Sequence, residues 1–132
     1  MENVQRTGNI LGSLLEEKLG SHPLVGDIRG RGFFWAVEFM LNSRTRTPFL
    51  KDDDFSGRVV EEALHTMHLQ VLRNMGFPGT WKVDSVVVCP PFAVSETDIK
   101  TIVNKLAEAV DIVSRPYLKP PPTLDSFDRV LR

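Results

Sequence analysis

Three parts of the chain place apolar residues on one face of a helix. Residues three, four and seven positions apart share one face of a helix. The apolar spacing therefore predicts helices over residues 2–19, from the acidic run 52–54 to about His68, and from Ser95 to Pro116. The apolar positions are Val4, Leu11, Leu14, Leu15 and Leu19, then Val59, Val60, Ala63, Leu64 and Met67, then Ile99, Ile102, Val103, Leu106, Val110 and Val113.

Residues at the helix ends have the chemistry of helix caps. Gly20 follows the last periodic position of the first helix and predicts a left-handed C-terminal cap. Ser95 and Asp98 form a near capping box for the third helix. Gly8 and Gly12 each weaken an exposed helix by about 1 kcal/mol relative to alanine. We therefore expect both glycines to pack closely against a neighbour, in this chain or in a part that it lacks.

Three shorter stretches have the composition of β-strands. Residues 33–40 alternate between two apolar faces, so we expect both faces to be largely buried and Glu38 to need a partner. Residues 70–73 and 85–89 predict two further short strands. The order helix, strand, helix, two strands, helix predicts an α+β fold. We expect a small antiparallel or mixed sheet of three to four strands with helices packed on one face.

Composition and charge exclude several classes of partner. Hydrophobic residues make up 42% and charged residues 25%, as in ordinary globular domains. The net charge of −1 gives no field that would attract nucleic acid or an anionic membrane. No apolar run approaches the ~20 residues that span a bilayer. The single cysteine, Cys89, is expected to lie buried in a strand and cannot form an internal disulfide.

The N-terminal residues are polar and enter a helix at once, without a signal peptide. We therefore expect the chain to begin in the middle of a longer protein. A cytoplasmic location is expected, and a mitochondrial one stays open because the natural N-terminus is expected to lie upstream.

Metal binding is not predicted. His65 and His68 are three residues apart on a helix, but the sequence places no further ligand beside them. The acidic run 52–54 lacks the glycine and the terminal glutamate of a calcium loop.

Two proline- or glycine-containing motifs flank the predicted strands. Arg29, Gly30 and Gly32 belong to HPLVGDIRGRGFFWAVEF, in which a Gly-Arg-Gly turn leads into a strand. Pro90 and Pro91 close the strand over residues 85–89. Taken alone, both motifs indicate structure and no chemistry.

Together these motifs carry a family resemblance. The chain contains, in order, a helix, the segment HPLVGDIRGRG leading into an apolar strand with a glutamate, the segment VLR, a loop, the segment DSVVVCPPF and a capped helix. This order resembles the C-terminal small domain of class III pyridoxal-phosphate-dependent aminotransferases, which are fold type I enzymes. The resemblance covers roughly residues 2–113. It implies a small domain over residues 1–115, followed by a Pro-rich tail over residues 116–132.

Arg73 is the candidate for substrate binding. An arginine at the end of a strand can present its planar fork to a carboxylate, or it can be an ordinary surface side chain. Amine and ω-amino-acid transaminases of this class are known for a mobile arginine at a similar place, which binds a keto-acid carboxylate and swings away for uncharged amines. The resemblance implies this role for Arg73. Residues 86–88 carry no arginine, unlike the ornithine-transaminase branch, so the chain is more similar to the amine:pyruvate branch.

The resemblance also implies what this chain lacks. In the family, pyridoxal phosphate binds a lysine of the large domain, and none of the six lysines here resembles it; they are Lys18, Lys51, Lys82, Lys100, Lys105 and Lys119. We expect the intact enzyme to be a homodimer that moves an amino group between an amine or ω-amino acid and a keto acid. The isolated chain would be inactive. The alternative is a stand-alone, catalytically inactive binding or interaction module.

Overall fold

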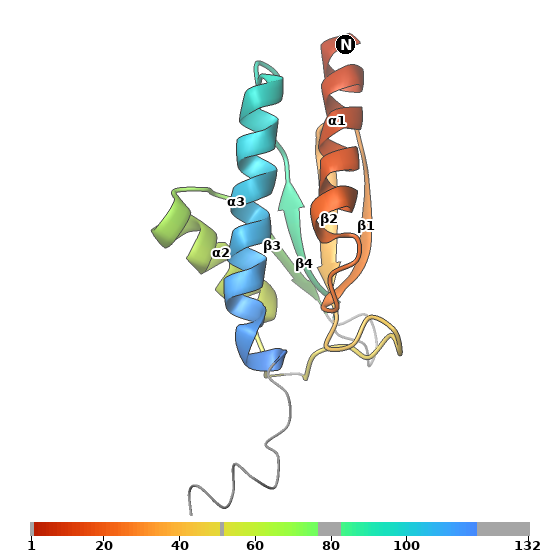
Figure 1. Cartoon of the computed structure of the whole chain (residues 1–132), viewed down its shortest axis with the longest axis vertical. Helices are drawn as coiled ribbons and strands as arrows, with labels where there is room; N and C mark the ends of the chain where they lie inside the picture. Colours follow the sequence, from red (N-terminus) through yellow and green to blue (C-terminus); the bar gives the residue numbers. More distant parts are fainter. Residues whose placement is uncertain (1, 51, 77–82, 119–132) are drawn as a thin grey trace, which may run out of the picture.

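The computed structural model describes residues 2–50, 52–76 and 83–118 (Figure 1). Most of the expected loop before the last strand, and the tail beyond Leu118, lie outside the described residues. The elements in chain order are α1 (Glu2–Leu19), β1 (Val25–Arg31), β2 (Phe34–Phe39), α2 (Phe55–Met67), β3 (Leu72–Gly76), β4 (Val83–Val88), α3 (Glu96–Ser114) and a short 3-10 helix, η1 (Arg115–Tyr117).

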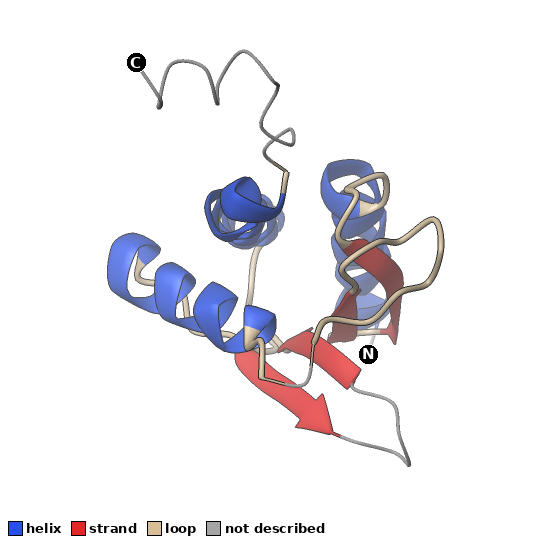
Figure 2. Cartoon of the chain, turned by 90° about the horizontal axis from the view of Figure 1, so that it is seen from below, coloured by secondary structure: helices blue, strands red, loops and turns tan. Residues whose placement is uncertain are grey.

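The four strands form one antiparallel sheet in the order β1-β2-β4-β3. Helix α1 packs on β1, α2 packs on β3 and β4, and α3 lies between the other two helices. Figure 2 shows α2 and α3 side by side above β3 and β4. Among the described residues the helices cover one face of the sheet and leave the other face open, which confirms the predicted α+β class.

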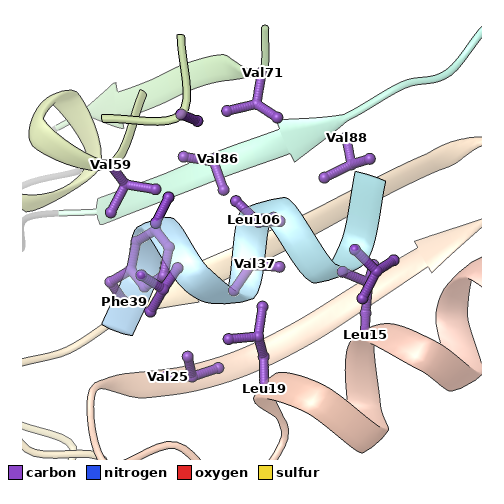
Figure 3. Packing of buried hydrophobic residues seen from close by; sticks show 14 of the residues in the cluster. Leu15, Leu19, Val25, Val37, Phe39, Val59, Val71, Val86, Val88 and Leu106 are labelled. Carbon is purple, nitrogen blue, oxygen red and sulfur yellow. The ribbon is translucent and has the colours of Figure 1, made fainter. Parts of the chain in front are cut away.

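The core lies between this sheet and the helices (Figure 3). Val37 and Val86 are paired on β2 and β4 and are completely buried beneath Leu106 of α3. Leu15 and Leu19 of α1 close the side of the core next to β1. Burial of each such side chain contributes about 1.5–3 kcal/mol, so the periodic apolar positions account for the way in which the helices dock.

One strand was missed by the sequence analysis. The sequence predicts no strand over residues 25–29 and predicts a Gly-Arg-Gly turn over residues 30–32, but residues 25–31 form β1, which pairs with β2 from Val25↔Phe39 to Arg31↔Phe34. The turn itself is Gly32 and Phe33, and Gly32 has a φ of +58°, which favours glycine. The β-propensity of this segment is low because glycine and charged residues dominate it, and pairing with β2 overrides that propensity.

Two glycines within α1 pack closely, as expected, but the glycine that follows α1 does not form the predicted cap. A Cβ on Gly8 would lie 2.4 Å from the carbonyl oxygen of Gly32, and a Cβ on Gly12 would lie 2.3 Å from the indole of Trp35. The close packing is confirmed, and the neighbour is the β1–β2 hairpin of this chain. The left-handed cap predicted at Gly20 is wrong, because its N–H continues the helical pattern to the Glu16 carbonyl at 2.8 Å and its φ is not positive.

Three predictions about the strands are also wrong. Cys89 is exposed, because β4 ends one residue earlier at Val88. Strand β3 begins at Leu72, two residues after the predicted start. The strand at residues 33–40 is not buried on both faces, since Phe34 is 62% exposed on the open side of the sheet. The second helix begins after the acidic run, as predicted, and Asp54 is its N-cap. The predicted cap of the third helix is confirmed as a complete capping box at Ser95.

Candidate functional site

Arg73 lies on the edge strand β3, beside the start of α2. It is paired with Val86 of β4. Paired residues of antiparallel strands project to the same face, and Val86 is completely buried beneath the helices. Arg73 is therefore on the helix side of the sheet, at its edge, where its side chain remains 39% exposed.

The guanidinium of Arg73 forms an ion pair with Asp54. Its Nη2 lies 2.9 Å from Oδ1 of that carboxylate. Asp54 is also the N-cap of α2, and the same Oδ1 accepts a hydrogen bond from the Gly57 N–H at 3.2 Å. The positive end of the helix dipole stabilises an anion at this position. The structure thus already holds one carboxylate against Arg73.

A second carboxylate reaches the start of α2 from the sheet. Asp84 of β4 is 1% exposed, and its Oδ1 accepts a hydrogen bond from the Ser56 N–H at 2.8 Å. Two acids from different parts of the chain therefore satisfy backbone donors in the first turn of α2. The sequence indicates Asp54 only as part of the acidic run 52–54 and does not indicate a capping role for Asp84. The acidic run before the helix was a signal for Asp54, whereas the capping role of Asp84 depends on a contact over 28 residues.

The candidates in the glycine-containing motif lie elsewhere. Arg29 is on β1, and its Nη1 donates to Glu38 at 2.8 Å and to Asp27 at 3.0 Å. The hydrogen bond to Glu38 raises the pKa of the Arg29 guanidinium further. This contact also provides the partner that Glu38 was expected to need. Gly30 lies in β1 opposite Trp35.

The structure does not bring Arg29 and Arg73 together. They lie on opposite edge strands, three strand spacings or about 14 Å apart. Val37 faces the core, so its neighbour Ala36 projects to the opposite, open face. Arg29 is paired with Ala36 and therefore also lies on the open face. Pro90, which is buried, and the exposed Pro91 follow β4 and end the strand. The motif residues thus shape the sheet, and Arg73 with Asp54 forms the candidate site.

Three of the six lysines lie among the described residues. Lys18 and Lys100 are exposed on α1 and α3, and Lys105 is half-buried on α3. The other three lysines lie outside the described residues. Within residues 2–50, 52–76 and 83–118, no three His, Cys, Asp or Glu side chains are grouped to hold a metal ion. The helices in this part of the chain are too short or too polar to cross a membrane.

Comparison with known proteins shows similarity to part of several aminotransferases. No protein-family model matches the chain. An aminotransferase of Gibberella zeae is 40% identical over 110 residues, which are 83% of this chain and 22% of that protein. A Bacillus anthracis aminotransferase structure is 30% identical with a TM-score of 0.73, covering 84% of this chain and 24% of its own.

The ω-transaminase of Pseudomonas jessenii, solved in complex with PMP, is 28% identical with a TM-score of 0.70, and the match covers 88% of this chain and 23% of that one. The chain is thus similar, in sequence and in fold, to the C-terminal part of aminotransferases. It spans about a quarter of the length of the relatives that it matches.

Proposed function

We propose that this chain is the C-terminal part of a class III, pyridoxal-phosphate-dependent transaminase. The intact enzyme would move an amino group between an amine or ω-amino acid and a keto acid. The observation that carries this proposal is the match of more than four fifths of the chain to about a quarter of several aminotransferases. Pyridoxal phosphate supplies the electron sink for such a transfer, and in this proposal its lysine belongs to a large domain outside these 132 residues.

Within that enzyme, Arg73 would bind the carboxylate of the keto acid. Its position supports this role, because the side chain is partly exposed at a sheet edge and already pairs with the Asp54 carboxylate at 2.9 Å. The planar guanidinium can form two parallel hydrogen bonds with a carboxylate, which an ammonium group cannot do. An amine that lacks a carboxylate would gain nothing from this contact.

The open face of the sheet supports the existence of a missing partner domain. Ala36, Val87 and Leu72 lie in one row across β2, β4 and β3, and Phe34 is two residues from Ala36 on the same face. Leu72 is 57% and Phe34 is 62% exposed. Val87, the middle residue of the row, is only 9% exposed, so Phe34 and Leu72 provide most of the exposed apolar area on this face. Exposed apolar side chains of this kind mark an interaction surface. We propose that the large domain covers this face in a homodimeric enzyme.

The alternative function, a stand-alone binding module, has one observation in its favour. Among the described residues the sheet and the helices enclose one buried core, and the neighbour that packs on Gly8 and Gly12 of α1 belongs to this chain. These contacts support independent folding, but they leave the exposure of Phe34 and Leu72 unexplained.

Transamination assays on two proteins separate these functions. One is the 132-residue chain, and the other is the same chain expressed with its upstream coding sequence. With pyridoxal phosphate, pyruvate and an arylalkylamine, we expect alanine formation only from the longer protein. Failure of the longer protein to bind the cofactor would contradict the transaminase proposal and leave the binding module.

A further inference from the structure

We propose that the free edge of β1 binds the same edge of a second copy of this chain, so that the two sheets continue into one. Strand β1 is at one end of the strand order β1-β2-β4-β3 and is the outermost strand next to β2 (Figure 1). Among the described residues it pairs with β2 alone. The backbone groups on its other side can therefore pair with a further strand. Such pairing is independent of the proposed transaminase activity.

The β1–β2 hairpin determines which backbone groups of β1 face outward. Its two-residue turn is flanked by the paired residues Arg31 and Phe34. The residues that flank such a turn exchange their N–H and C=O groups, and pairs of this kind alternate along the strands with pairs that do not. Ile28 and Gly30 belong to the second kind, so their N–H and C=O groups point away from β2. These groups form the free edge.

The free edge ends at a β-bulge. The register with β2 shifts between Val25 and Asp27, which makes Gly26 the bulged residue. The carbonyl oxygen of Gly26 already accepts a hydrogen bond from Nη1 of Arg46 at 2.6 Å. Bulges and occupied carbonyl groups prevent the addition of a strand. The pairing is therefore confined to the part of β1 that follows the bulge.

Charge selects the register of the two antiparallel copies, in which a two-fold axis repeats every contact. If Ile28 lies opposite Ile28 of the second copy, the bulge interrupts the pairing. If Gly30 lies opposite Gly30, Arg29 lies opposite Arg31 at both ends of the contact, and like charges repel. In the crosswise register, Ile28 lies opposite Gly30. Asp27 then lies opposite Arg31 at both ends, and opposite charges attract. The crosswise register is therefore favoured.

The charged side chains of β1 suit the crosswise register. Asp27 and Arg31 are exposed, and Arg31 forms no ion pair within the described part of the chain. Asp27 accepts a hydrogen bond from Arg29 through Oδ2 at 3.0 Å and can accept further bonds through Oδ1. The Arg29 side chains of the two copies lie opposite each other in this register. Because Asp27 and Glu38 already balance the charge of Arg29, their repulsion is small.

The helix side of the free edge provides an apolar contact for the second copy. Gly30 has no side chain, and the indole of Trp35 covers it, so that a Cβ on Gly30 would lie 2.5 Å from that ring. Trp35 is half-buried and lines a groove beside α1 with Asn9 and Ser13. In the crosswise register, Ile28 of the second copy lies opposite Gly30 and packs against the indole. The contact thus buries apolar area that Ile28 and Trp35 leave exposed.

Charge reversal tests this pairing in the full 132-residue chain, for which sedimentation equilibrium over a range of concentrations measures the dimer dissociation constant. Asp27→Lys places two positive charges at each end of the contact, and Arg31→Glu places two negative charges there. Each variant alone should therefore dimerise about tenfold more weakly than the native chain. An equimolar mixture of the two variants again brings opposite charges together at both ends. The mixture should recover dimers of about the native strength.

Glu108→Lys and Lys100→Glu are the matched controls, because they change the net charge equally and lie exposed on α3. Both should dimerise as the native chain does. A native chain that stays monomeric at every concentration would overturn the proposal. So would a mixture of Asp27→Lys and Arg31→Glu that dimerises no better than either variant alone. Dimers that form equally well in all variants, but are lost in Leu72→Thr, would instead assign the contact to the open face of the sheet and overturn the role of the β1 edge.

Discussion

The hydroxyl of Tyr117 donates a hydrogen bond to the carboxylate of Asp53 at 2.7 Å, joining residues 64 positions apart in the sequence. Arg58 contacts the same two groups from α2. The Tyr117 ring packs edge-on against Phe49 and Phe55, with centroids 5.3 and 5.6 Å away. These contacts attach η1 and the end of α3 to the segment that leads into α2. Asp53 in this segment directly precedes Asp54, which pairs with Arg73.

We predict that loss of the Tyr117 ring destabilises the fold. Tyr117→Ala should lower the free energy of unfolding by about 2–4 kcal/mol, because it removes a half-buried ring and leaves Phe49 and Phe55 without their edge contact. Tyr117→Phe removes only the hydroxyl and should cost about 1 kcal/mol. Urea denaturation of the chain measures both. Equal stability of Tyr117→Ala and the native chain would show that this cluster does not anchor the end of α3.

His22 predicts a pH dependence of stability. Its side chain is 9% exposed; Nδ1 accepts the Leu24 N–H at 3.1 Å, and Nε2 lies 3.3 Å from Asp111. Burial lowers the pKa of His22 below its ordinary value, although Asp111 opposes this shift. The unfolded chain therefore binds the proton more readily. The stabilising contribution is complete above the unfolded pKa of about 6.5 and is lost as pH falls towards the folded pKa.

Urea denaturation at pH 8 and pH 5 checks this expectation. The loss of stability between the two pH values should be smaller in His22→Gln than in the native chain. Asp111→Asn should lower the pKa of His22 further, because it removes the charge that favours the imidazolium. A folded-state pKa of His22 above 6.5 by NMR titration would reverse the predicted sign.

The open face of the sheet predicts dye binding by the isolated chain. Phe34→Thr and Leu72→Thr introduce a β-branched residue, which suits a strand, and remove exposed apolar area, so both should reduce the fluorescence of a hydrophobic dye without large loss of stability. Leu64→Gln is the control, because Leu64 is 42% exposed on α2, away from this face. Equal dye binding by all four proteins would argue against the open face as a covered surface.

The helices could be predicted from sequence because their signals are local. Apolar spacing located all three, and the capping box formed by Ser95 and Asp98 marked the start of α3 to the residue. The missed strand shows the opposite case. Segment 25–31 contains Gly26 and Gly30, and its pairing with β2 provides the stabilisation that its own composition does not.

The candidate site could be predicted only in part for a similar reason. Family resemblance singled out Arg73, but its ion pair joins residues 19 positions apart in sequence and depends on how β3 docks beside α2. The buried cap from Asp84 and the hydrogen bond from Tyr117 to Asp53 are longer-range still. No periodicity or spacing within a single element encodes such contacts, because tertiary packing alone brings the partners together.

Arg73 gives the most direct kinetic prediction for the enzyme that contains this chain. Arg73→Ala should reduce kcat/KM for pyruvate and alanine by about thirty- to a thousandfold, or about 2–4 kcal/mol, because a bidentate charge-assisted contact is lost. Half-reactions with an arylalkylamine should change little. Arg73→Lys should recover only part of the loss, since a point charge cannot reproduce the planar fork. If Arg73 is only a surface residue, its removal will alter stability by about 0.5 kcal/mol or less and leave selectivity unchanged. Equal losses with alanine and with the arylalkylamine would end the carboxylate-binding role.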